Sequence, residues 1–220
     1  MFCWIRIVLI FLFRLIGSPS LVLPKIYPMR IFPLSLLSFF VIACNNPQEE
    51  TKIASRHSVS FNSSIRQAMT SYEALTEAFV NWDSTRASAD AKQVEAKLAG
   101  IKLDEFNNEE KQTAAASLDL AKKDVESMIA ATNMEAKRRS LNALTQNLYD
   151  FLRAVRYDEK QIYLQECPMA FNDTEAAVWL TDKGKDSIRN PYLGLHHPRY
   201  GKGMLDCGDN KSVIDFTKEK

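Results

Sequence analysis

The chain has 220 residues, 46% of them hydrophobic, and its 28 basic and 27 acidic side chains nearly cancel. A formal net charge of +1 gives no large positive surplus for nucleic-acid binding, so we expect no nucleic-acid partner. A chain of this length supports one ordinary hydrophobic core, and we expect one folded domain.

Residues 1–43 are apolar with scattered basic side chains and no acidic one. Within them, Met29-Arg30 and the apolar run that follows have the pattern of a secretory signal. Either this signal is unusually long or Met29 is the true start, and we favour the second. A membrane span over residues 5–16 is the third alternative, but it is short of the roughly 20 residues that a helix needs to cross a bilayer.

The signal region ends in Val41-Ile42-Ala43-Cys44, which resembles a bacterial lipobox, so Cys44 is the predicted site of lipidation. Asn45 and Asn46 follow, and the Asp that resembles an inner-membrane retention signal is missing. We therefore expect a lipoprotein anchored in the outer membrane, facing the periplasm or the cell surface. Residues 44–58 are polar and aperiodic, which predicts a lipidated tether in which His57 is solvated.

The folded domain is predicted over residues 59–220, and its first part is helical. Between Phe61 and Tyr163 there is no proline and a single glycine, Gly100. Apolar side chains recur every three or four residues in four sets, as on one face of a helix. The sets are Ile65, Ala68, Tyr72, Leu75, Phe79 and Trp82; Ala87, Ala91, Val94, Leu98 and Ile101; Ala114, Leu118, Ala121, Val125, Met128 and Thr132; and Leu141, Leu144, Leu148, Phe151 and Val155.

Helix boundaries are marked by capping residues. Asn107 with Glu110 three residues later, and Thr132-Asn133-Met134-Glu135, resemble capping boxes, and Gly100 is a candidate C-cap. Lys137-Arg138-Arg139 is expected on a solvated face. These elements predict an all-α fold, an up-down bundle of about four helices.

The C-terminal part, residues 161–210, breaks the helical period. Five of the seven glycines and three of the eight prolines fall there, which predicts an irregular segment built from turns. Gln161–Gln165 alternates and is predicted as a short strand leading to Cys167, and Val178-Trp179-Leu180 is a second short apolar stretch. Both are expected to lay the segment against one end of the bundle.

Soft metal ligands gather in this segment. Thiolates and thioethers are the donors that suit Cu(I), and imidazole accepts copper or zinc. The predicted ligands are Cys167, Met169, Met204 and Cys207, with His197 as an optional fifth. The alternative is a Cys167–Cys207 disulfide, which would stabilise the fold by about 3–4 kcal/mol without any metal. An exported protein with two cysteines invites such a bond, so both interpretations stay open.

Four motifs carry a resemblance to a known family: Glu166-Cys-Pro-Met-Ala-Phe-Asn, Ala177-Val-Trp-Leu, Ile188-Arg-Asn-Pro-Tyr-Leu-Gly and Gly203-Met-Leu-Asp-Cys-Gly. The chain resembles the DUF3347 family over roughly residues 60–215. The resemblance implies an exported helical protein of Bacteroidetes-type bacteria, found alone or fused to periplasmic adaptors of copper and other heavy-metal efflux pumps. Asp209 departs from the Glu of the pattern, and Leu195–Lys202 is an insert that carries His196 and His197.

We therefore expect a lipid-anchored envelope protein that binds copper and buffers it or passes it to an efflux system, with a pump adaptor as partner. The alternative is a disulfide-closed interaction module that docks on an envelope complex without binding metal. Enzyme signatures such as Cys-x-x-Cys, Cys-x-x-Cys-His and His-Glu-x-x-His are missing from the sequence, and we expect no enzymatic activity.

Overall fold

The computed structural model describes residues 54–218. The signal region 1–43, the lipidation site Cys44 and the tether up to residue 53 lie outside the described residues and stay predictions. Four helices come first: α1 (Val59–Val80), α2 (Ser84–Ala99), α3 (Asn108–Ala130) and α4 (Met134–Ala154). Three strands follow: β1 (Ile162–Phe171), β2 (Glu175–Thr181) and β3 (Asp209–Ile214), with the short 3₁₀ helix η1 (Lys202–Met204) before β3. None of the described helices is long and apolar enough to span a membrane.

The capping residues predicted from the sequence are found at the helix ends. The side chain of Asn107 accepts hydrogen bonds from the backbone N–H groups of Glu109 and Glu110, and Asn133 accepts one from Ala136. Such caps satisfy N–H groups that have no partner inside the helix. Gly100 is the C-cap of α2. The four-helix prediction is confirmed.

The four apolar sets form the core of the bundle, with two exceptions at helix ends. Nearly all of their side chains are buried. Thr132 is exposed beyond the end of α3, and Trp82 lies beyond α1, where its φ of 58° breaks the helical path. The 3.6-residue period therefore predicts the buried face correctly but cannot mark the residue at which a helix stops.

The C-terminal part corrects the all-α prediction, because it contains a three-stranded antiparallel sheet of order β2-β1-β3. Tyr163 of β1 lies opposite Thr181 of β2, and Ile162 lies opposite Ile214 of β3. The predicted strand at Gln161–Gln165 is confirmed, but β1 runs on to Phe171 with an irregularity after Cys167. Pro168 falls at that irregularity, one of the places in a sheet that tolerates a residue without an N–H group.

The sequence prediction did not include the turn between β1 and β2. Three residues, Asn172 to Thr174, separate the paired residues Phe171 and Glu175, and two of them, Asn172 and Asp173, have positive φ, 52° and 63°. The sequence prediction treated this stretch as irregular because the apolar alternation ends at Gln165, and β3 pairs with β1 residues far away in the chain. Strand pairing of this kind leaves little local signal.

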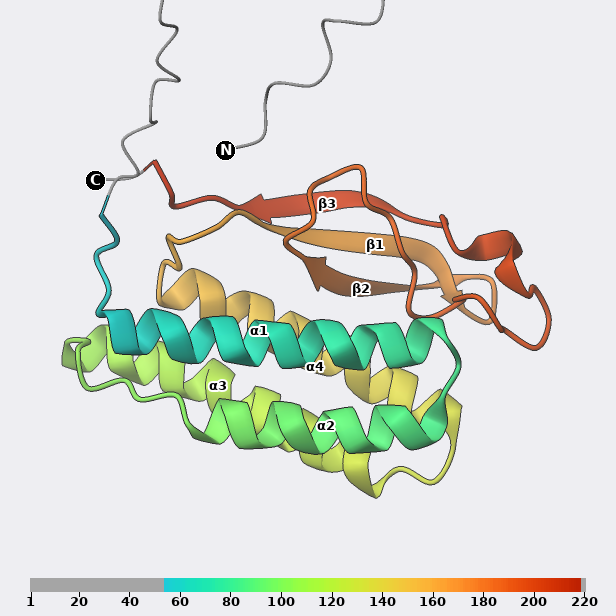
Figure 1. The fold of residues 1–220 in the computed structure, drawn as a ribbon, viewed down its shortest axis with the longest axis horizontal. Coiled ribbons are helices and arrows are strands. Elements are labelled where there is room, and N and C mark those ends of the chain that lie inside the picture. Colours follow the sequence, from blue (N-terminus) through green and yellow to red (C-terminus); the bar gives the residue numbers. More distant parts are fainter. Residues whose placement is uncertain (1–53, 219–220) are drawn as a thin grey trace, which may run out of the picture. The chain divides into compact units, whose positions relative to one another are not determined.

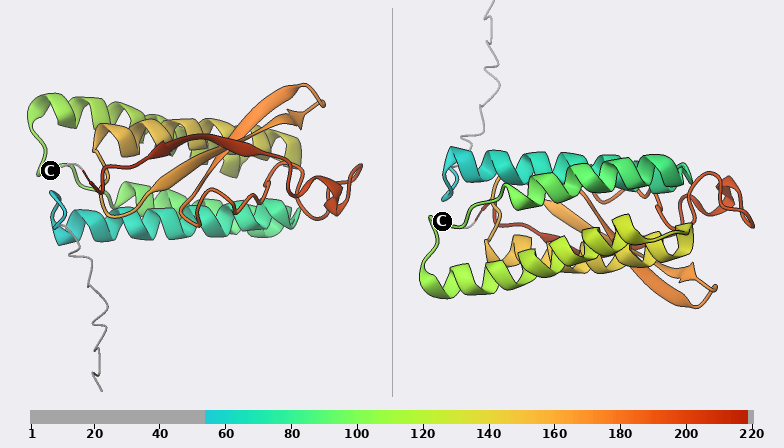
Figure 2. Two further views of the ribbon diagram at one scale, coloured as in Figure 1. Left: turned by 90° about the horizontal axis from the view of Figure 1, so that it is seen from above. Right: turned by 90° about the horizontal axis from the view of Figure 1, so that it is seen from below.

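The elements form layers, which Figures 1 and 2 show from three sides. Helices α1 and α4 lie next to the sheet, and α2 and α3 lie on the far side of them. The Tyr72 hydroxyl of α1 lies 2.6 Å from Thr145 Oγ1 of α4 and accepts a hydrogen bond from the Leu180 N–H of β2. These buried bonds join both inner helices to the sheet.

Candidate functional site

The two cysteines of the C-terminal part meet on the sheet. Cys167 lies in β1 and Cys207 two residues before β3, and a disulfide joins them with a Cα–Cα distance of 5.6 Å. Cys167 is fully buried and Cys207 half-buried. Of the two alternatives that the sequence leaves open for this pair, the structure contains the disulfide.

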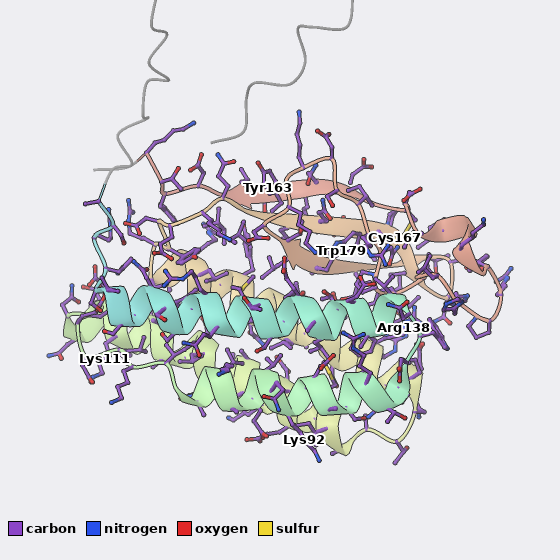
Figure 3. The ribbon with its side chains drawn as sticks, viewed as in Figure 1. Lys92, Lys111, Arg138, Tyr163, Cys167 and Trp179 are labelled. Carbon is purple, nitrogen blue, oxygen red and sulfur yellow. A yellow bond between two sulfur atoms is a disulfide. The ribbon has the colours of Figure 1, made fainter. Side chains whose placement is uncertain are left out.

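The disulfide lies on the sheet face that points away from α4. Side chains alternate along a strand, and Ser212 of β3, opposite Leu164, bonds to Tyr149 of α4 at 2.8 Å. Cys167 and Trp179 of β2 therefore belong to the other face, and both are labelled in Figure 3. The ring of Trp179 packs so closely on Gly208 that a Cβ at this glycine would overlap it.

Asn190 organises the loop that carries Cys207. It is completely buried, and its side-chain amide donates to the carbonyl oxygen of Cys207 at 2.8 Å. Its side-chain oxygen accepts from the backbone N–H groups of Tyr192 and Leu193 at 2.7 and 3.1 Å. The local signal for this role was the Asn-Pro dipeptide, which is typical of a turn.

The same loop docks on the C-terminal end of α1, as Figure 1 shows. The Leu195 N–H donates to the carbonyl oxygen of Val80 at 2.7 Å, and Gly194, with φ of 38°, packs against that carbonyl. Arg189 donates two hydrogen bonds to Glu77, at 2.6 and 2.7 Å. These bonds hold the pKa of Glu77 below its ordinary value. The loop is thus fixed to both the sheet and the bundle.

The two predicted methionine ligands differ in their surroundings. Met204, in η1, is half-buried against the core, and its carbonyl oxygen accepts a hydrogen bond from the Cys207 N–H at 3.1 Å. Met169, two residues after Cys167 in β1, is 37% exposed. The structure therefore places Met204 in the same turn as Cys207 and leaves Met169 at the surface.

His197 has a packing role that the sequence did not indicate. Its ring stacks on Tyr200 and meets Trp82 edge-on, with centroid distances of 4.9 and 4.8 Å. Its Nδ1 accepts from the N–H groups of Arg199 and Tyr200. Burial, and then the charge of Arg138, lowers its pKa. His196 is exposed. Among residues 54–218, no three His, Cys, Asp or Glu side chains lie together as a metal-binding group.

The basic run at the start of α4 corrects the expectation of a solvated face, since Lys137 and Arg138 are only 4% exposed. Lys137 donates to the carbonyl oxygens of Met128 and Ala131, which lie at the C-terminal end of α3. Arg138 donates to the Ala170 carbonyl oxygen at 3.0 Å, and burial lowers its pKa to about 10.

Aromatic rings surround the Arg138 guanidinium. Its central carbon lies 4.8, 5.2 and 6.0 Å from the ring centroids of Trp82, Phe171 and Tyr192. A cation over aromatic faces is stabilised by the ring quadrupoles. Arg138 therefore joins α4, the end of β1 and the loop that carries Asn190, at the end of the molecule where Figure 3 shows Cys167. A run of charges alone cannot reveal this.

His57 also departs from its prediction as a solvated residue. Its side chain is 5% exposed, and its ring packs against Phe61 and Phe106. Its Nδ1 lies 3.1 Å from Glu105, and its Nε2 lies 3.3 Å from the carbonyl oxygen of Arg156. The last residues before α1 are therefore packed on the end of the bundle, and they do not behave as a free tether.

Comparison with known proteins then gives a family. The family model described as "Protein of unknown function (DUF3347)" matches residues 68–160. Over these residues the chain belongs to the DUF3347 family. The family prediction is confirmed, although the match covers the helices, whereas the DUF3347 motifs quoted above lie at 166–208. No curated protein and no solved structure matches the chain.

Proposed function

We propose that this DUF3347 protein binds a soft metal ion, Cu(I) first, at the Cys167–Cys207 pair in its reduced state, and buffers the ion or passes it to an efflux system. One observation carries the proposal: the fold brings two cysteines that are 40 residues apart to bonding distance. Once reduced and deprotonated, they are two adjacent thiolates, the donors that Cu(I) prefers.

The neighbouring side chains suit a site of this kind. Met204 shares the turn of Cys207 and would add a neutral thioether, while Trp179, 2% exposed, closes off the sheet face beside Cys167. A neutral soft donor allows exchange with a partner better than a third thiolate. Met169 and His197 are weaker candidates, because one lies at the surface and the other packs between aromatic rings.

The test is an anaerobic titration of the reduced domain with Cu(I) against a chromophoric chelator. We expect one-to-one binding, with Cys167→Ser or Cys207→Ser lowering the affinity by on the order of 100-fold. Met204→Leu, which keeps the volume but removes the thioether, should cost about tenfold. His197→Gln is the matched control and should change little. Unchanged affinity in Cys167→Ser contradicts the assignment.

The disulfide itself favours a second candidate, an interaction module that docks on an envelope complex, such as the adaptor of a heavy-metal efflux pump, without binding metal. A thiol titration of protein purified from the cell envelope without reductant separates the two. Thiols that appear only after a chelator removes metal support the copper site. A protein without free thiols before and after chelation supports the module.

We also propose that Cys44 anchors the protein in the outer membrane through a lipid. The lipobox-like sequence before it supports this. Cys44→Ser should move the protein from the membrane fraction to the soluble envelope fraction. A variant that stays with the membrane contradicts the anchor.

A further inference from the structure

We propose that the Cys167–Cys207 disulfide is a reversible thiol–disulfide exchange site that an external dithiol attacks at Cys207. The segment that carries Cys207, residues 190–207, keeps its fold when the bond is open. This goes beyond the proposed function, because exchange at Cys207 holds whether or not the reduced pair then binds copper.

The two sulfurs differ in access. Cys167 has no exposed surface and sits in the central strand, opposite Ala177. Cys207 is half-buried and follows the exposed Asp206, in the turn after η1. Which sulfur is attacked depends on access and on the leaving thiol. An incoming thiolate therefore reaches Cys207 first.

The exchange balances with a dithiol as the reductant. Its thiolate attacks the sulfur of Cys207, the sulfur–sulfur bond breaks, and Cys167 leaves as the thiolate. The second thiol of the reductant loses its proton to water, and its thiolate then attacks the reductant's own sulfur in the mixed disulfide with Cys207. This releases the Cys207 thiolate and closes a disulfide in the reductant, so two electrons have moved from the dithiol to the cysteine pair.

The contacts that hold the segment do not depend on the disulfide. Asn190 binds the carbonyl oxygen of Cys207 and two backbone N–H groups of its own loop. The Tyr192 hydroxyl donates to the carbonyl oxygen of Val178 at 2.6 Å, and the Leu195 N–H donates to Val80. Opening one bond between sulfurs removes none of these, so the two thiols stay close together.

Glutathione, a monothiol, maps the attacked sulfur. The oxidised protein is treated with it, quenched with acid and alkylated, and the mixed disulfide is located by peptide mass. We expect glutathione on Cys207 at least about tenfold more often than on Cys167. The denatured protein is the matched control and should give both products in similar amounts. Equal labelling in the folded protein, labelling of Cys167, or no reduction at all overturns the proposal.

The claim that the segment stays folded without the disulfide is tested by its backbone amide resonances in NMR spectra. In the fully reduced protein, and in Cys167→Ser/Cys207→Ser as a form that cannot reoxidise, Tyr192, Leu193 and Leu195 should keep the positions they have in the oxidised protein. Shifts are expected only next to the two cysteines. Collapse of these resonances to unfolded positions, while the helices stay folded, overturns the claim that the segment is held without the disulfide.

Discussion

The helical bundle and the C-terminal part of this protein are stabilised in different ways. The bundle is built from repeats of one local rule, an apolar face and a capped start, applied four times. The C-terminal part depends on single residues, such as Asn190 and Gly194, each of which joins segments distant in the chain. A bundle position therefore tolerates change better than these positions, and the predictions below compare the two, beginning with the largest expected effect.

Asn190→Ala should be the most harmful single change. It leaves two buried backbone N–H groups and the partly buried Cys207 carbonyl oxygen without their partner, and each buried group costs about 1–3 kcal/mol. We expect urea unfolding to show a loss of about 4 kcal/mol. The bundle control is Asn147→Ala, which removes one half-buried bond to Asp124 and should cost about 1 kcal/mol. Equal losses would remove the distinction between the regions.

Cys167→Ser/Cys207→Ser should lower the free energy of unfolding by about 3–4 kcal/mol, because the disulfide restricts the unfolded chain. The helical signal in circular dichroism at low temperature should stay unchanged, since the bundle packs without these residues. The same loss should appear when the natural protein is measured with and without reductant. A variant as stable as the oxidised protein contradicts this account of the bond.

Gly194→Ala should cost about 3 kcal/mol, because the new Cβ meets the carbonyl oxygen of Val80 at a residue with positive φ. Gly203→Ala is its matched control, since a Cβ there meets nothing within 4 Å, and it should change stability by less than about 0.5 kcal/mol. If both variants behave alike, the loop does not dock on α1 as described.

The ion pair between Arg189 and Glu77 should give a small effect that depends on pH. The hydrogen bonds from Arg189 lower the pKa of Glu77 below its ordinary 4.5. The pair therefore stabilises the folded state above that pH, and this stabilisation is lost as the pH falls through the lowered pKa of Glu77. Arg189→Gln should cost up to about 1 kcal/mol at pH 7, because a partly exposed pair is screened, and less at pH 2, where protonation of Glu77 weakens the pair. Arg86→Gln, within α2, should change little at either pH. A loss for Arg189→Gln that is the same at both pH values contradicts the ion-pair account.

The same contrast explains which features the sequence predicts. The four helices, the N-caps Asn107 and Asn133 and the C-cap Gly100 follow from signals within about 20 residues of the chain, so they were predicted correctly. Only one strand of the sheet was predicted, since the pairing of Cys167, Trp179 and Ser212 with residues of other strands leaves no periodic pattern in the sequence. Lys137, Arg138 and His57 looked like surface residues because their burial depends on Met128, Ala170 and Glu105 in other segments.

For the site, the sequence predicted that the parts carrying Cys167 and Cys207 come together, and the disulfide requires this. It could not choose between a bond and a metal site, because both need the same proximity of sulfur atoms. Nothing in the sequence indicated the packing role of His197, since its ring packs between Tyr200 and Trp82, and Trp82 lies more than a hundred residues earlier in the chain.

The most direct test of the central claim is a parallel Cu(I) titration of the oxidised and the fully reduced protein, each in competition with the same chelator. The account predicts one-to-one binding in the reduced protein and at least about 100-fold weaker binding in the oxidised protein, where the two thiolates are absent. Equal affinity in both forms, or no binding in the reduced form, would contradict it.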